Sequence, residues 1–216
     1  TVLRGCPNLQ DMTLKINADL KIDTEESFNH KELKSISFET DSRYLNILDY
    51  LDFFSSVCPN ILSLEFKVFD VQIEQLVSKV GNFKNLVNLI IENEDNEVDC
   101  EINTIFENSP KLKCLELESV DNIFNLSLNK KNLEHLTALK LKACHGLPHS
   151  FLTGILDNAP ELKLVCLERC VGLDFTLNQA FLELFEQKYK EKYKERPICF
   201  FYEVYVDYLE SETLNS

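Results

Sequence analysis

The feature that most limits what this chain can fold into is a short apolar pattern that recurs along its 216 residues. Each copy has an apolar residue, two variable residues, a second apolar residue, one variable residue and a third apolar residue. The seven copies are Leu9/Met12/Leu14, Leu33/Ile36/Phe38, Ile61/Leu64/Phe66, Leu86/Leu89/Ile91, Leu112/Leu115/Leu117, Leu136/Leu139/Leu141 and Leu162/Val165/Leu167. Their first positions lie 24, 28, 25, 26, 24 and 26 residues apart. A period in the twenties predicts a solenoid, whose units bury their apolar faces only against neighbouring units.

The pattern also predicts the elements of each unit. Within a copy, the last two apolar residues alternate with variable ones, which indicates a short strand with one buried face. The chain must then return to the start of the next strand, and a parallel connection of this length usually contains a helix. Apolar residues at helical spacing occur in the returns over 47–54, 73–80 and 151–156. Residues 18–30 and 120–132 lack such a face, so we expect loop, 3₁₀ or extended segments there. Pro59, Pro110 and Pro160 each lie two residues before the next copy, where proline ends a helix.

Together these elements predict an α/β fold with a curved parallel sheet on the inside and helices and loops outside. Curvature is expected because helices occupy about 10 Å laterally, whereas neighbouring strands lie about 4.8 Å apart. The variable strand residues would line the concave face. In the last repeats they combine an apolar strip with charges, which is typical of a protein-binding patch. The alternative is an exposed strand face without a partner. The candidate partner-binding residues are Ile90, Cys114, Glu116, Glu118, Ala138, Lys140, Lys142, Leu164, Cys166 and Glu168.

The two ends of the chain depart from the repeat. Residues 2–9 look like the end of a helical return followed by a proline corner, so we expect more sequence before Thr1. Thr176 and Gln179 have the spacing of a capping box that opens a longer helix. Residues 198–206 then alternate as a final strand. We interpret residues 1–216 as one domain of about seven repeats with a C-terminal cap at 174–210.

Eight cysteines are spread along the chain, several of them at equivalent positions of the repeat. Free cysteine behaves as a small buried hydrophobe, so we expect reduced thiols and a cytoplasmic or nuclear protein. Cys144, His145, His149 and Cys170 raise the alternative of a zinc site. Structural zinc sites usually bring paired ligands at short spacings. We therefore favour a buried cysteine in each turn that hydrogen-bonds loop backbone, and predict no metal.

Charge and motifs narrow the function. A formal net charge of −14 argues against nucleic acid and anionic membranes, which both favour Lys and Arg. The basic stretch 188–196 is compatible with a nucleic-acid or acidic-partner contact, although a solvated helix face is the simpler interpretation. No apolar run reaches the roughly 18 residues of a membrane-spanning helix. No phosphate-binding or nucleophile motif is present, so we predict neither an enzyme nor a cofactor.

Residues 136–147 and 162–173 resemble cysteine-containing leucine-rich repeats, in which a cysteine follows shortly after the strand, as Cys144 and Cys170 do here. The corners at 6–9 and 58–61 resemble the C-P-N-L corner of the same class. This class is typical of F-box proteins with leucine-rich repeats. The resemblance implies the substrate-binding arm of an SCF-type ubiquitin ligase, with a target protein on the concave face. The ligase adaptor would be bound only through an F-box preceding Thr1.

Two other functions are compatible with the same repeats. One is an inhibitor or scaffold similar to ribonuclease inhibitor, which binds a protein partner without ubiquitin transfer. The other is an extracellular recognition module, which a leader peptide and disulfides would indicate.

Overall fold

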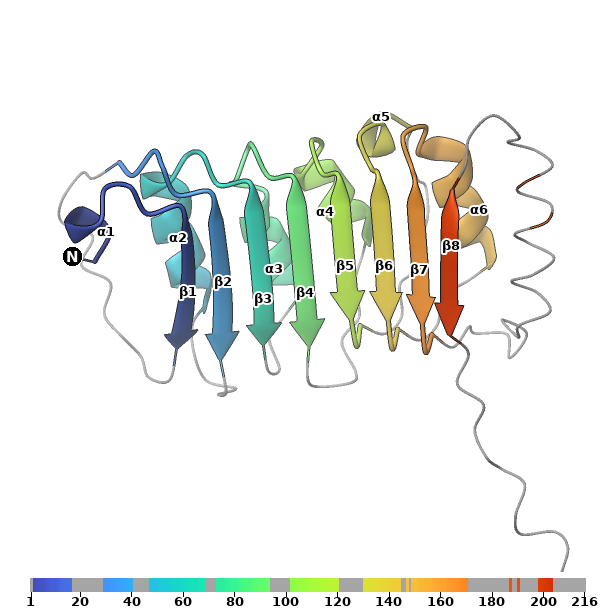
Figure 1. Ribbon diagram of the computed structural model, residues 1–216, viewed down its shortest axis with the longest axis horizontal. Helices are drawn as coiled ribbons and strands as arrows, with labels where there is room; N and C mark the ends of the chain where they lie inside the picture. The colour runs from blue at the N-terminus through green and yellow to red at the C-terminus, as the bar shows by residue number, and fades with distance from the viewer. Residues whose placement is uncertain are drawn as a thin grey trace, which may run out of the picture.

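The computed structural model describes residues 2–16, 29–40, 47–68, 73–93, 102–120, 130–144, 147, 149–170, 187, 190 and 198–203. Within these residues, eight parallel strands form one sheet, and each strand pairs with the next one along the chain. Figure 1 shows the strands side by side, all pointing the same way. Their bounds are β1 (Asp11–Ile16), β2 (Ser35–Thr40), β3 (Ser63–Val68), β4 (Asn88–Asn93), β5 (Cys114–Glu118), β6 (Ala138–Lys142), β7 (Leu164–Glu168) and β8 (Cys199–Glu203). The predicted α/β fold with a parallel sheet is confirmed, including the final strand.

The register aligns the repeated apolar residues into two files. The first file contains Met12, Ile36, Leu64, Leu89, Leu115, Leu139 and Val165, and the second contains Leu14, Phe38, Phe66, Ile91, Leu117, Leu141 and Leu167. From β2 to β6 every one of these side chains is fully buried. Burying one such side chain contributes about 1.5–3 kcal/mol. A slip of one residue would turn a whole strand's apolar set outward, so the shared core specifies the register.

The helices that connect the strands lie on one side of the sheet, behind the strands in Figure 1, whereas the first helix lies beyond the edge of the sheet at β1. The helices are α1 (Val2–Gly5), α2 (Ile47–Val57), α3 (Ile73–Val80), α4 (Ile102–Asn108), α5 (Lys130–Leu133) and α6 (His149–Asn158). The predicted helices are confirmed as α2, α3 and α6. Helices α2, α4 and α6 each end two residues before a proline, as predicted for Pro59, Pro110 and Pro160. We call the opposite side of the sheet the open face, and its predicted concave curvature stays a prediction.

Aromatic side chains fill the core between the sheet and α2. Phe38 of β2 stacks on Phe66 of β3 with ring centroids 5.3 Å apart. Phe54 of α2 meets Phe38 edge-on at 5.9 Å. Such pairs stabilise a core by about 0.5–1.5 kcal/mol beyond the area that they bury. The early units are therefore held by aromatic contacts, whereas Leu115, Leu139 and their neighbours fill the later ones.

A repeated corner sets the start of each strand from β2 to β7. The carbonyl of the residue before one strand accepts two N–H groups from the next unit: Gln10 O accepts from Lys34 and Ser35 at 2.7 and 3.0 Å. At several other corners the first apolar residue donates its N–H to the carbonyl three residues earlier, as Leu112 does to Ser109 O. At the β2 corner the equivalent Leu33 N–H donates to the side chain of the buried His30 instead, with Nδ1 at 3.1 Å. His30 Nε2 lies 2.9 Å from Cys6 O, so the ring ties this corner to the one before it.

Some predictions concern segments that the structure describes only in part. The helix predicted to follow Thr176 and most of the cap at 174–210 lie outside the described residues, as do 17–28 and 121–129. Helix α5, however, begins at Lys130 within a return that we expected to lack helix. Its four residues bury only Leu133, so there is no periodic apolar face for the sequence to reveal.

Candidate protein-binding face

The open face is built from three rows of side chains, each row crossing the strands at one register position. The first row contains Asp11, Ser35, Ser63, Asn88, Cys114, Ala138, Leu164 and Cys199. The middle row contains Thr13, Ser37, Glu65, Ile90, Glu116, Lys140, Cys166 and Phe201. The charged row contains Lys15, Glu39, Lys67, Glu92, Glu118, Lys142 and Glu168. Alternation along each strand turns all three rows away from the helices, with about 6.6 Å between rows.

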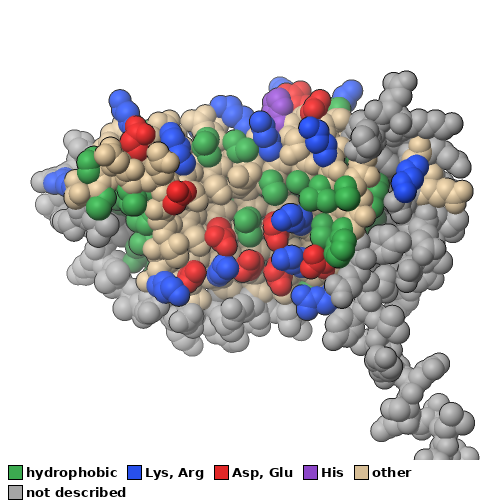
Figure 2. Space-filling view, in the orientation of Figure 1, with side chains coloured by type: hydrophobic (Ala, Val, Ile, Leu, Met, Phe, Trp, Pro, Cys, Tyr) green, Lys and Arg blue, Asp and Glu red, His purple; other side chains and the backbone are tan. Residues whose placement is uncertain are grey.

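Apolar side chains gather over β5 to β8. We call this group the apolar patch; its members are Cys114, Ala138, Leu164, Cys166, Cys199 and Phe201. Figure 2 shows apolar side chains over these strands beside a group of charged side chains. Phe201 is 52% exposed, and of the large apolar residues in the described part of the chain only Leu62 is also exposed. The bulky part of the patch therefore lies at β7 and β8.

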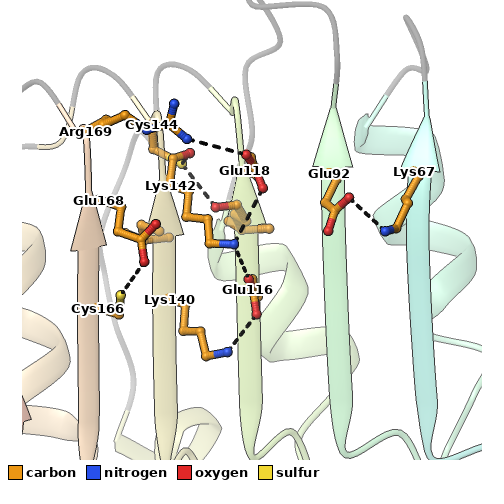
Figure 3. A network of polar contacts seen from close by, with 12 residues as sticks. Lys67, Glu92, Glu116, Glu118, Lys140, Lys142, Cys144, Cys166, Glu168 and Arg169 are labelled. Carbon is orange, nitrogen blue, oxygen red and sulfur yellow. Dashed lines mark hydrogen bonds and ion pairs between the residues drawn. The ribbon is translucent and has the colours of Figure 1, made fainter. Parts of the chain in front are cut away.

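Glu116 lies at the centre of an ion-pair network beside this patch (Figure 3). Its two carboxylate oxygens each accept one lysine: Lys140 Nζ lies 3.0 Å from Oε2, and Lys142 Nζ lies 3.0 Å from Oε1. The Glu116 side chain is only 10% exposed, whereas the two lysine side chains are 36% and 27% exposed. The network joins β5 to β6 across the open face.

The pKa values of these groups reflect the same contacts. Burial raises the pKa of the Glu116 carboxyl, but hydrogen bonds and positive charge from Lys140 and Lys142 outweigh it, so that the pKa lies below 4.5. Hydrogen bonding to Glu116 raises the pKa of both lysines above 10.5. All three groups are therefore charged at neutral pH. The two lysines are less available to a partner than the sequence alone suggests, because Glu116 already holds them.

Other carboxylates of the open face are paired in the same way. Glu118 lies 3.7 Å from Lys142 and 3.8 Å from Arg169. Lys67 bridges Glu65 and Glu92, each at 3.4 Å, and Lys15 lies 2.7 Å from Glu39. Each of these partly or largely exposed pairs contributes little to stability on its own. Their consequence is that much of the charge on this face is neutralised internally.

Glu168 differs from the paired carboxylates. Within the described residues it has no Lys or Arg nitrogen within 4.0 Å, and its Oε1 accepts the Cys166 thiol at 3.3 Å. This carboxylate lies two residues from Cys166 and four from Leu164 on the same face of β7. The apolar patch is thus bordered by one acidic group that forms no ion pair within the described chain, although its charge still acts on Lys142, its register partner on β6.

The strands β5 to β7 end in a repeated left-handed turn. Ser119, Ala143 and Arg169 have φ values of 54°, 47° and 53°. The next residue of the last two turns is a cysteine that bonds backbone carbonyls. The Cys144 thiol donates to Leu117 O at 3.5 Å, and the Cys170 thiol donates to Leu141 O at 3.3 Å. The predicted hydrogen bonding of these cysteines to backbone is confirmed, but the acceptors are strand carbonyls rather than loop carbonyls, and Cys170 is only partly buried.

The zinc alternative concerns the same turns. Hydrogen bonding with Cys144, together with burial, raises the pKa of the Cys170 thiol. Among the described residues, no three His, Cys, Asp or Glu side chains are grouped so as to hold a metal ion. His145 and the side chain of His149 lie outside that part of the structure.

All ten residues predicted to contact a partner lie on strands of the sheet, in open-face positions. Ile90 stands apart from the apolar patch, because Glu65 and Glu116 flank it in the middle row. Glu116 and Cys166 are both buried, so they support the open face more than they present atoms to a partner. Cys199 and Phe201 also face outward but are not among the ten predicted residues. The sequence does indicate them, because residues 198–206 alternate as a strand: if Ile198 and Phe200 face the core, Cys199 and Phe201 must face outward.

In the portion of the chain that the structure covers, no helix combines the length and apolar character needed to cross a membrane. A scan against protein-family models and a search of curated proteins found no match to this chain.

Proposed function

We propose that this chain is a leucine-rich-repeat solenoid that recognises another protein through its open face. The observation that carries the proposal is the position of the apolar patch on an ordered sheet that no helix of the described chain covers. An exposed Phe201 beside Leu164, with charged side chains around them, matches the anatomy of an interface with an apolar core and a polar rim. In this proposal the chain is not an enzyme and uses no cofactor.

Within that function, we favour the substrate-binding arm of an F-box protein in an SCF-type ubiquitin ligase. The support is the cysteine turn, in which Cys144 and Cys170 each bond a carbonyl of the preceding strand. Residues 136–147 and 162–173 resemble the repeats of that class at the same positions. The domain would act by presentation: it holds the target while other subunits transfer ubiquitin. An inhibitor or scaffold similar to ribonuclease inhibitor is the second candidate, since it would use the same face.

The first experiment addresses the ligase role. The natural full-length protein, purified from its own cells, is expected to bring down the ligase adaptor together with a target protein. Recovery of a protein partner without the adaptor would favour the inhibitor or scaffold.

The second experiment addresses the face itself. Phe201→Asp should abolish recovery of the target without affecting recovery of the adaptor. Leu62→Asp is the matched control, because Leu62 is 39% exposed but precedes β3 outside the apolar patch. If both variants lost the target equally, or if neither lost it, the open face would not be the binding surface.

A further inference from the structure

The unpaired carboxylate beside the apolar patch indicates what kind of protein segment fits there. Glu39, Glu65, Glu92, Glu116 and Glu118 each have a Lys or Arg within 4.0 Å. Within the described residues Glu168 has no such cation in contact, and its Oε1 accepts the neutral Cys166 thiol at 3.3 Å. Burial, followed by the hydrogen bond to Glu168, raises the pKa of that thiol to about 11, so it stays protonated at neutral pH and brings no charge. Lys142, the register partner of Glu168, interacts with its charge but is hydrogen-bonded to Glu116 at 3.0 Å. The Glu168 carboxylate can therefore still accept a cation from outside in a direct ion pair.

We propose that the apolar patch and Glu168 together bind a basic segment of a partner protein, which seats one bulky apolar side chain on Leu164 and Phe201 and directs a Lys or Arg to Glu168. This inference rests on the proposed function and names its partner class. An acidic segment would be repelled by Glu168 and by the net charge of −14, which instead steers basic partners toward the chain.

The register sets the spacing of the two contacts. Leu164, Cys166 and Glu168 occupy the first, middle and charged rows of β7, and Phe201 pairs with Cys166 from β8. Rows lie about 6.6 Å apart, so the apolar and acidic contacts are separated by roughly 7–13 Å. In an extended segment, residues on one side recur every two positions, which corresponds to the same distances. The segment therefore carries its Lys or Arg two or four residues from its apolar side chain.

Selection from a displayed library of random peptides against the immobilised chain tests this. Enriched peptides are expected to contain a Lys or Arg two or four residues from a Leu, Ile, Met or aromatic residue. Their affinity should fall about tenfold with Glu168→Gln, which removes one charge-assisted contact, and at least as much with Phe201→Asp. Glu39→Gln and Leu62→Asp should change it less than twofold, because Glu39 is paired with Lys15 and Leu62 lies outside the patch. Melting temperatures of the four variants establish that each one folds.

The outcomes separate this inference from the function on which it rests. Peptides without a basic residue, or peptides whose affinity is unaffected by Glu168→Gln, would overturn the partner class. If the affinity of those peptides still fell with Phe201→Asp, the open face would remain the binding surface. Peptides that ignore both residues would overturn the site as well. Failure to enrich any peptide would also count against a linear basic segment, whatever full-length partner the chain binds.

Discussion

At the scale of single residues, close packing determines which side chains are tolerated. Gly81 follows α3 and lies against Asn108, the last residue of α4. A Cβ at this position would lie 2.9 Å from the Asn108 Cβ and 3.3 Å from Ser78 O, closer than such atoms normally approach. The glycine is therefore required by space between two helices of neighbouring units.

Gly81→Ala is accordingly expected to lower the free energy of unfolding by about 1–2 kcal/mol, because Asn108 must move to admit the methyl group. Gly5→Ala is the matched control: a Cβ there would have no neighbour within 4 Å. The Gly5→Ala variant should be as stable as the wild type or slightly more stable, because alanine lowers the conformational entropy of the unfolded chain. Urea titration of both variants measures the difference, and equal stabilities would mean that α3 and α4 are less closely packed.

The left-handed turn at Ala143 leads to a prediction of the opposite sign. A left-handed conformation raises the free energy of an L-residue by about 1–2 kcal/mol, a strain that glycine does not have. Glycine partly offsets this gain, because it also increases the conformational entropy of the unfolded chain. Ala143→Gly is expected to raise the free energy of unfolding by up to about 1 kcal/mol. Ala138→Gly, in strand β6, should instead lower it by about 0.5–1 kcal/mol. Similar losses in both variants would show that the turn is not left-handed.

At the scale of elements, Glu116 couples β5 to β6 through Lys140 and Lys142. Glu116→Gln removes the negative charge and leaves two lysines side by side, so we expect a loss of about 1–2 kcal/mol at pH 7. The folded-state pKa of Glu116 is lowered, so its contribution is fully present above the ordinary value of about 4.5. It disappears as the pH falls through the lower folded-state pKa.

Unfolding measured from pH 7 down to pH 3 tests this. The stability difference between the wild type and Glu116→Gln should narrow below about pH 4.5. Glu39→Gln, in a more exposed pair with Lys15, should show a smaller difference throughout. If the difference in free energy of unfolding between the wild type and Glu116→Gln stayed constant over the whole pH range, the charge of Glu116 would not be its source.

The elements also show how far the sequence was informative. Strands and the helices α2, α3 and α6 could be predicted, because the apolar residues that define them recur at a fixed period and all face one core. Helix α5 could not, since Leu133 is its one buried residue. The ten open-face residues follow from alternation, but their pairing does not. Whether Lys142 reaches Glu116 or a partner depends on side-chain positions across two strands, about which a one-dimensional pattern carries no information.

At the scale of the whole molecule, the two faces of the sheet are under different constraints. The helix-facing side of the sheet is uniform, because each unit must present the same apolar residues to its neighbours. The open face is free to vary, and it changes from small polar residues such as Ser37 in the early strands to Leu164 and Phe201 in the late ones. The variation is thus confined to the open face and leaves the core unchanged.

The stacking of units in chain order is the claim on which all of this depends, and methyl contacts measured by NMR test it directly. With assigned, isotope-labelled leucine methyl groups, contacts are expected between Leu64 and Leu89, between Leu89 and Leu115, and between Leu115 and Leu139. Strands two steps apart lie about 10 Å from each other, so Leu64 should show none to Leu115. Absence of the consecutive contacts, or direct contacts between Leu64 and Leu139, would contradict the account.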